Sequence, residues 1–165
     1  MNHGSDFLYK QEEDIYMLSH KSLYIVIVGC GRLGSFLANR MSREGHGVVV
    51  IDNDETAFNA LSLDYSGFRL VGDAVEFAVL KKGRIAQADM VIAATRDDNS
   101  NLMVSQIAKR IFHVPRVIAR ILDPKRAEIY HDFGIEIVCP TLIEYDFFSG
   151  MLELPSSEAG KGKAS

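Results

Sequence analysis

The feature that most constrains the fold of this chain is a glycine-rich turn, Gly29-Cys30-Gly31-Arg32-Leu33-Gly34, which follows the apolar run 24–28. Its spacing is typical of a strand-to-helix turn that binds a dinucleotide. The first glycine permits the tight turn, the second lets backbone approach a phosphate, and the third lets the helix pack close to the strand. The helix offers its unpaired N–H groups and positive dipole end to an anion. All six residues are therefore candidate cofactor-binding residues.

An acidic residue at the end of the next apolar run supports this interpretation. The run 48–51 ends at Asp52, 18 residues after Gly34, close to the ~20 expected for the acid that hydrogen-bonds the ribose hydroxyls. A carboxylate there favours a free 2′-hydroxyl and repels a 2′-phosphate, which indicates NAD or another adenosine nucleotide over NADP. Asn53, the next residue, is a further candidate. The alternative is that Asp52 caps a helix that begins near Glu55.

Length and composition exclude several classes of protein. A chain of 165 residues, 47% of them hydrophobic, fits one globular domain with a full core. The net charge of −4, with no basic cluster, gives no electrostatic footprint for nucleic acid. The apolar runs are too short to span a membrane, so we expect a soluble cytoplasmic protein. The two cysteines and scattered histidines lack the spacing of a metal site, and none is expected.

The periodicity predicts an alternation of strands and helices. Strands are predicted at 24–28, 48–52, 68–71, 89–94, 116–121 and 135–139. They are nearly continuous apolar runs, as a parallel sheet covered on both faces requires. The predicted fold class is therefore α/β: a doubly wound, parallel, six-stranded Rossmann sheet with strand order 3-2-1-4-5-6.

Two details of the predicted helices can be compared directly with the structure. Residues 33, 36, 37 and 41 are apolar and are expected to form one buried stripe on the first helix. Asn99 or Asn101 is expected to cap the helix that follows the fourth strand.

The final helix, expected over 141–153, is unusually rich in large apolar side chains. Such a helix can bury only part of them on its own domain, and an exposed apolar surface usually marks a contact with a partner. We therefore expect a subunit contact there; the alternative is an ordinary core helix. The predicted organisation is an N-terminal arm at 1–22 without a readable role, a nucleotide-binding domain at 23–140, this helix, and a flexible tail at 154–165.

The remaining candidate residues follow the predicted strands, because ligands of such sheets bind beyond the carboxyl ends of the strands. Small residues leave room for a ribose or pyrophosphate, Thr95 offers a hydroxyl, and Asp73 can accept from the adenine amine. The candidates are Gly72, Asp73 and Ala74 after the third strand, Ala93, Ala94 and Thr95 at the end of the fourth, and Arg120 in the fifth.

Three of the polar candidates have alternatives. Asp73 is about as well explained as a cap or turn residue. Arg32 is able to reach a phosphate or to lie solvated on its helix. Arg120 lies within an apolar run and needs an anion, which is either a ligand phosphate or a protein carboxylate.

Taken together, these stretches resemble the RCK or TrkA-N domain family. The resemblance is carried by 26–34, 50–52, 71–74, 88–95, 98–101, 117–120 with 123–124, and 138–140. It covers about residues 23 to 150. The Gly-Asp-Ala sequence after the third strand and the Asp-Asn run that contains Asn99 are together more specific than the glycine turn alone.

The resemblance implies a function. RCK domains are the regulatory, nucleotide-binding domains of bacterial potassium transporters and channels. It implies a cytosolic subunit of a Trk or Ktr-type uptake system that binds NAD(H), ATP, ADP or AMP and gates a membrane partner. It also implies a homodimer or higher oligomer joined through the 141–153 helix. Whether another polypeptide supplies the C-terminal lobe of full-length relatives is left open by the resemblance.

Two other functions remain open from the sequence. One is an NAD-dependent oxidoreductase or a lyase, although no His, Lys or Tyr is placed as an evident general acid and no catalytic residue is assigned. The other is a scaffold whose pocket is vestigial.

Overall fold

A computed structural model describes residues 22–130 and 133–152. Most of the predicted arm at 1–22 and all of the predicted tail at 154–165 lie outside these residues. The elements, in chain order, are β1 (Tyr24–Val28), α2 (Arg32–Arg43), β2 (Gly47–Asp52), η1 (Glu55–Ala60), β3 (Phe68–Val71), α3 (Phe77–Lys82), η2 (Ile85–Gln87), β4 (Met90–Ala93), α4 (Asp98–Gln106), η3 (Ile107–Ile111), β5 (Arg116–Arg120), α5 (Pro124–Tyr130), β6 (Glu136–Val138) and α6 (Pro140–Leu152).

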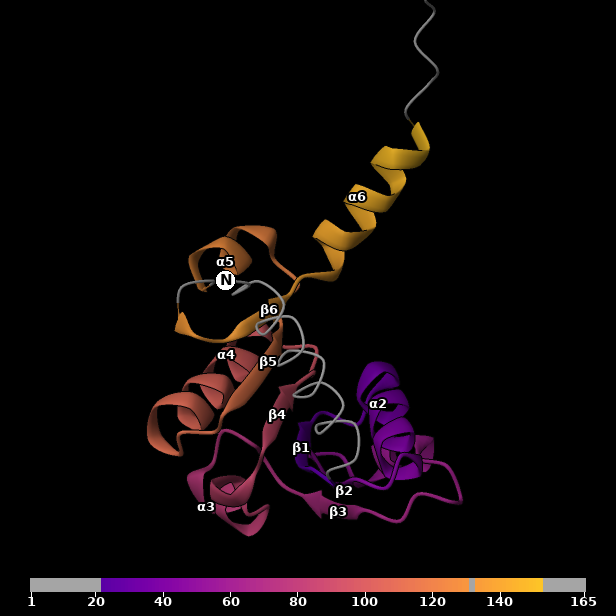
Figure 1. Cartoon of the computed structure of the whole chain (residues 1–165), viewed down its shortest axis with the longest axis vertical. Coiled ribbons are helices and arrows are strands. Elements are labelled where there is room, and N and C mark those ends of the chain that lie inside the picture. Colours follow the sequence, from indigo (N-terminus) through magenta and orange to yellow (C-terminus); the bar gives the residue numbers. More distant parts are fainter. Residues whose placement is uncertain (1–21, 131–132, 153–165) are drawn as a thin grey trace, which may run out of the picture.

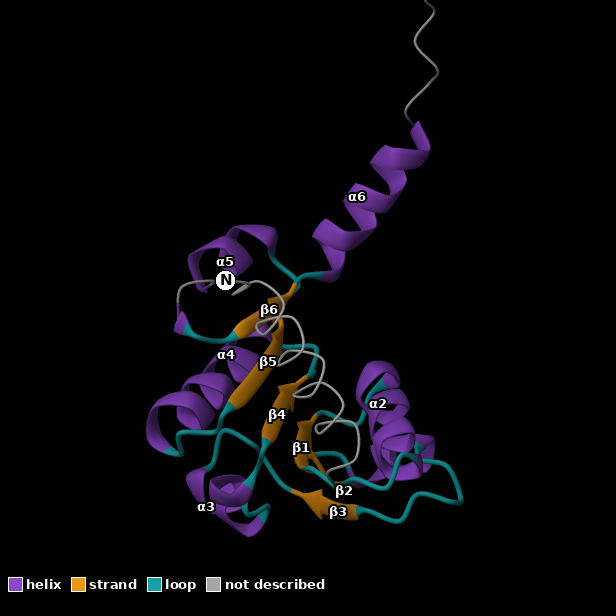
Figure 2. Ribbon diagram, viewed as in Figure 1, coloured by secondary structure: helices purple, strands orange, loops and turns teal. Residues whose placement is uncertain are grey.

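The strands form one parallel sheet of six strands in the order β3-β2-β1-β4-β5-β6 (Figure 2). This confirms the predicted fold class and strand order. β1 lies at the centre, where Ile25 is in register with Val48 of β2 and Met90 of β4. The chain therefore turns to one side of β1 and then to the other, and a crevice is expected where the order reverses.

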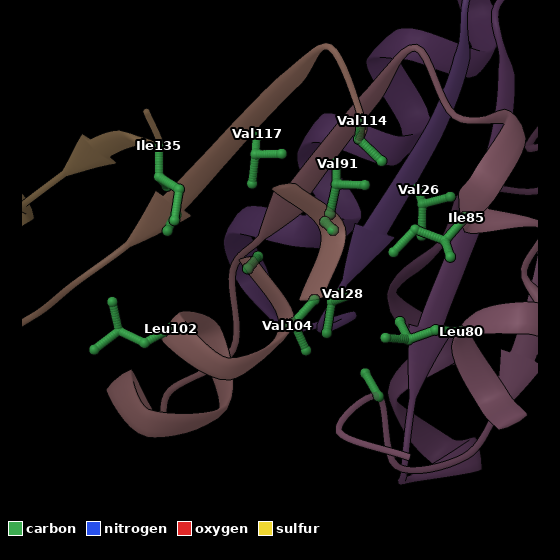
Figure 3. Close-up of a cluster of buried hydrophobic side chains, with 14 of the residues drawn as sticks. Val26, Val28, Leu80, Ile85, Val91, Leu102, Val104, Val114, Val117 and Ile135 are labelled. Carbon is green, nitrogen blue, oxygen red and sulfur yellow. The ribbon is translucent and has the colours of Figure 1, made fainter. Parts of the chain in front are cut away.

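Helices cover both faces of the sheet (Figure 1). On one face, α3, α4 and α5 pack over alternate side chains of the central strands, with Val26 and Val28 of β1 among them. Figure 3 shows part of this cluster, in which Leu80 and Val104 come from the helices and Val91 from β4. On the other face, α2 and η1 cover Ile25 and its neighbours. Burial on two faces explains why the sequences of β1, β2 and β4 are continuously apolar, whereas the edge strands β3 and β6 are more exposed and include Arg69 and Glu136.

The buried face of α2 differs from the predicted stripe. Its buried residues are small: Gly34, Ser35, Ala38 and Ser42. Leu33 is 38% exposed and Phe36 is 74% exposed, whereas Leu37 and Met41 are half-buried at the edge of the core. The close approach of the helix to the glycine turn leaves no room for large side chains on its inner face, so the large apolar residues lie beside that face or away from it.

Two other helices differ from simple expectation. The segment after β2 is a short 3-10 helix, η1, rather than an α-helix. The helix after β4 is regular to Gln106 and continues as a π-helix, η3, over Ile107–Ile111. The strand boundaries agree with the predicted ones to within one residue.

Helix α6 extends away from the body of the molecule (Figure 1). None of its residues is buried, and seven large apolar side chains are exposed: Leu142, Ile143, Tyr145, Phe147, Phe148, Met151 and Leu152. The alternative of an ordinary core helix is therefore wrong. In the part of the chain that the structure describes, no helix, α6 included, has both the length and the hydropathy to cross a membrane.

Candidate functional site

A cleft of about 400 Å³ lies at the carboxyl edge of the sheet, where the strand order reverses. The register brings the strand ends together there, because Val28 pairs with both Ile51 and Ala93, and Asp52 pairs with Val71. The residues that follow these pairs therefore meet at one edge. The lining consists of Val28, Gly29, Gly31, Ile51, Asp52, Asn53, Asp54, Ala57, Gly72, Asp73, Ala74, Ala94, Thr95, Arg96, Asp97 and Ser100.

The glycine turn forms one wall of the cleft, and its three glycines have different roles. Gly29 has φ +97°, and a Cβ there would lie 2.9 Å from the main-chain nitrogen of Thr95. Gly34 packs so closely that a Cβ would overlap the carbonyl oxygen of Gly29. Gly31 has open space on its Cβ side and lines the cleft. Two glycines are therefore required by the fold, and the third leaves the surface of the cleft unobstructed.

Asp52 holds the turn from the neighbouring strand. Its Oδ2 accepts from the main-chain N–H of Cys30 at 2.6 Å, and its Oδ1 accepts from that of Asp54 at 3.0 Å. The cap of η1 is Asp54, whose side chain accepts from the N–H of Thr56. The alternative that Asp52 caps this helix is therefore wrong. Asp52 links the turn after β1 to the end of β2 and still presents a carboxylate to the cleft.

The lining carries more negative than positive side chains. Asp54 accepts hydrogen bonds from Thr56, and Asp97 accepts them from Ser100. In both pairs the side-chain hydroxyl first, and the main-chain N–H second, lower the pKa of the carboxyl. Asp73 accepts from the N–H of Val75, as in the turn that was its alternative role. The one cationic side chain in the lining is that of Arg96. An anionic ligand here has to rely on main-chain N–H groups more than on cations.

Cys30 contributes its main chain to the site rather than its thiol. The side chain is 1% exposed. Burial first, and the carboxylate of Asp52 second, raise the pKa of the thiol to about 11. The thiol is therefore protonated and unreactive near neutral pH. Among the described residues there is no group of three or more His, Cys, Asp or Glu placed to hold a metal ion.

A buried polar network joins Thr95, after β4, to the end of β5. Asn101 is fully buried; its Oδ1 accepts from the N–H of Thr95 at 2.9 Å, and its Nδ2 donates to the carbonyl of Arg120 at 2.8 Å. The cap of α4 is Asp97, which accepts from Ser100. The expectation that Asn99 or Asn101 caps this helix is therefore wrong, because Asn101 joins two strand ends instead.

Arg120 also differs from its expectation. The guanidinium donates to the main-chain oxygen of Thr95 at 2.7 Å. Its Nε is buried and has no hydrogen-bond partner among the described residues. Its protein partner is therefore a carbonyl and not a carboxylate, and the side chain stabilises the segment that follows β4.

Nine of the sixteen candidate residues line the cleft: Gly29, Gly31, Asp52, Asn53, Gly72, Asp73, Ala74, Ala94 and Thr95. Cys30, Arg32, Leu33, Gly34, Ala93, Asn99 and Arg120 lie outside this lining. Arg32 is exposed, and the side chain of Asn99 accepts from Arg126 at 2.7 Å. The sequence analysis did not select four lining residues: Asp54, Arg96, Asp97 and Ser100. All four follow the carboxyl end of a predicted strand, and that position could have identified them.

Comparison with known families agrees with this geometry. The family model described as the TrkA-N domain matches residues 25–140, which contain every residue that lines the cleft and the whole sheet except Tyr24. The chain belongs to the TrkA-N domain family.

Relatives of this TrkA-N domain are named as Trk system potassium uptake proteins. The "Trk system potassium uptake protein TrkA" of Streptomyces coelicolor is 41% identical over 116 residues, which are 70% of this chain and 52% of that protein. The TrkA homolog of Methanothermobacter thermautotrophicus is 34% identical over 116 residues, 70% of this chain and 53% of that protein. The chain thus spans about half the length of these relatives.

Solved structures share the fold of this TrkA-N domain. The TrkA-N domain of inner membrane protein ybaL from Escherichia coli has a TM-score of 0.70 at 18% identity, covering 81% of this chain and 99% of that one. GsuK bound to ADP gives 0.66 at 22% identity, with 79% and 34% covered. The Shewanella denitrificans Kef CTD in its AMP-bound form gives 0.60 at 19% identity, with 81% and 83% covered.

Proposed function

We propose that this TrkA-N domain binds an adenine nucleotide in the cleft and thereby regulates a membrane potassium transport protein. The cleft at the reversal of strand order, with Gly31 free of obstruction and Asp52 on the adjacent strand, is the observation that carries the binding part. The names of the relatives support the transport part. The proposal places the protein in the cytoplasm, peripherally associated with its membrane partner.

The charges of the lining favour some nucleotides over others. Four aspartates and one arginine line the cleft, so each additional phosphate of a ligand increases the repulsion. NAD carries two phosphates, offset in part by its cationic ring, and offers two ribose diols to carboxylates. Asp52 also disfavours the 2′-phosphate of NADP. We therefore rank NAD(H), AMP and ADP as better candidates than free ATP.

Titration calorimetry with AMP, ADP, ATP, NAD and NADH tests the proposal. At least one of the five is expected to bind with a dissociation constant well below the millimolar range, which corresponds to about 4 kcal/mol. If all five bind more weakly, nucleotide binding is contradicted and the scaffold with a vestigial pocket becomes the better interpretation.

Asp52→Ala is expected to weaken the binding of adenosine ligands by about 1.5 to 3 kcal/mol, the range for a hydrogen bond to a charged group. The dissociation constant should rise roughly ten- to 150-fold in the same calorimetric assay. Asp52→Asn is the matched control, because it keeps an acceptor for the N–H of Cys30 but removes the charge. Asp52→Asn should reduce the difference in affinity between NAD and NADP. An unchanged affinity in Asp52→Ala would place the ribose elsewhere.

We also propose that α6 joins this chain to a second copy of itself. Its exposed apolar side chains lie on all sides of the helix, and a helix of this kind is stable in water only when another surface covers it. The helix follows β6 directly and extends beyond the body (Figure 1), so a partner is able to reach it without displacing the sheet.

Phe148→Glu is expected to shift the protein toward the monomer, because it introduces a charge on a side chain that is 62% exposed in the isolated chain and buried in the proposed contact. Sedimentation velocity over a range of concentrations measures the change. Glu144→Gln, on the same helix, should leave the association unaltered. A wild-type protein that stays monomeric at every concentration would contradict this part of the proposal.

Catalysis has less support than binding. Within the described part of the chain, the lining of the cleft includes no His, Lys or Tyr, the side chains most suited to proton transfer beside a nicotinamide. Stable NADH binding without turnover supports the regulatory function. Oxidation of NADH in the presence of small carbonyl compounds would favour the oxidoreductase.

A further inference from the structure

The first turn of α6 is joined by hydrogen bonds to Asp98, the chain neighbour of a residue that lines the cleft. The lining of the cleft includes Asp97 and Ser100 at the start of α4. Asp98, the first residue of α4 after its cap, is not part of this lining. Its Oδ1 accepts from the N–H of Leu122 at 2.8 Å and its Oδ2 from the N–H of Asp123 at 3.0 Å. One carboxylate thus fixes the loop between β5 and α5 to the start of α4.

The same loop forms a hydrogen bond with the first turn of α6. The carbonyl oxygen of Leu122 accepts from the hydroxyl of Thr141 at 3.0 Å, and the thiol of Cys139 lies 3.8 Å from the same oxygen. The peptide between Leu122 and Asp123 therefore bonds to Asp98 through the N–H of Asp123 and to Thr141 through the carbonyl of Leu122. A displacement of one side of this peptide is transmitted to the other, because both bonds are short and both partners lie at the ends of helices.

Packing constrains the direction of α6 only weakly. An apolar groove of about 290 Å³ lies between its first turn and the elements α5 and β6, lined by Ala127, Ile137 and Leu142 among others. The remaining turns extend beyond the body (Figure 1). The hydrogen bond of Thr141 therefore has more influence on the orientation of this helix than it would have on a helix packed along its length.

We propose that Asp98 and Thr141 are positioning residues that couple the occupancy of the cleft to the orientation of α6 through the peptide between Leu122 and Asp123. The inference rests on the proposed nucleotide binding and specifies how that binding is transmitted. A ligand that orders the start of α4 fixes Asp98, which fixes Leu122, which strengthens the attachment of the first turn of α6. Only a ligand with different affinities for the two orientations shifts their populations.

Hydrogen–deuterium exchange of the full chain, with and without NAD or ADP in excess, tests the coupling. In the wild type, nucleotide is expected to slow exchange at 93–98 and also at 141–146, the latter by about threefold or more. Thr141→Val keeps the shape of the side chain and removes the hydroxyl, so slowing should persist at 93–98 and be lost at 141–146. Thr141→Ser keeps the hydroxyl and should therefore show the wild-type slowing of exchange at 141–146.

Exchange at 93–98 tests nucleotide binding, and exchange at 141–146 tests the coupling to α6. If nucleotide slows exchange at 141–146 equally in Thr141→Val and wild type, the coupling is overturned. Slowing at 93–98 without any at 141–146 in the wild type also overturns it, while the proposed nucleotide binding stands. If neither nucleotide slows exchange at 93–98 in the wild type, the proposed function and the coupling are both contradicted.

Discussion

Gly34→Ala should destabilise the protein by more than about 3 kcal/mol, toward the upper end of what overpacking costs. The added Cβ would overlap the carbonyl oxygen of Gly29 and lie 3.0 Å from its carbonyl carbon. Both are backbone atoms of a turn that is held from β2, because Gly29 donates to Ile51 at 2.8 Å. Neither the helix nor the turn is free to move away. Urea unfolding followed by circular dichroism measures the loss.

Gly31→Ala is the matched control for this substitution. It introduces the same methyl group three residues earlier, where no heavy atom lies within 4 Å of the new Cβ. Gly31 has φ −69° and ψ −170°, a conformation open to any residue. Its free energy of unfolding should remain near the wild-type value, apart from the lost glycine cap, about 1 kcal/mol at most. Equal stability of Gly34→Ala and wild type would show that α2 does not need this close approach.

Gly31→Val should abolish nucleotide binding in a protein that remains folded. The side chain would project from the turn into the cleft that Gly31 lines, where the proposed phosphates approach the main chain. The loss should exceed the roughly 3 kcal/mol expected at most for Asp52→Ala, because occlusion removes the subsite rather than one bond. Calorimetric titration with NAD and ADP measures the affinity.

Substitution of Gly34 should therefore lower the free energy of unfolding, whereas substitution of Gly31 should lower the affinity for nucleotide. Gly31→Val should keep the circular dichroism spectrum of the wild type, and Gly31→Ala should give an intermediate affinity. Nucleotide binding by Gly31→Val at wild-type affinity would mean that phosphates do not lie along this turn, even if the fold is correctly described.

The sheet was predictable because its determinants are local. The central strands β1, β2 and β4 are apolar runs that are buried on both faces, so their positions and their parallel pairing follow from the sequence pattern. The order of the strands then follows from right-handed crossovers and from the glycine turn after β1. The meeting of Gly29, Asp52 and Thr95 at one edge is a consequence of that topology.

The differences arise where a three-dimensional contact competes with a local preference. Asn101 is a plausible helix cap by sequence, yet its amide satisfies the main chains of two different strands. Phe36 fits the helical period of a buried stripe, but the close contact of Gly34 with the turn places small residues against the sheet. The partner of Arg120 is a main-chain oxygen, for which a sequence carries no signal.

The geometry of α6 amplifies small movements at its base. Its 13 residues span about 20 Å at 1.5 Å per residue. A tilt of roughly 10° about Thr141 would therefore displace the far end of the helix by about 3 Å. A movement too small to change the packing of the sheet would then separate or bring together two surfaces attached at that far end. The length of this helix therefore sets how far those surfaces move for a given tilt at its first turn.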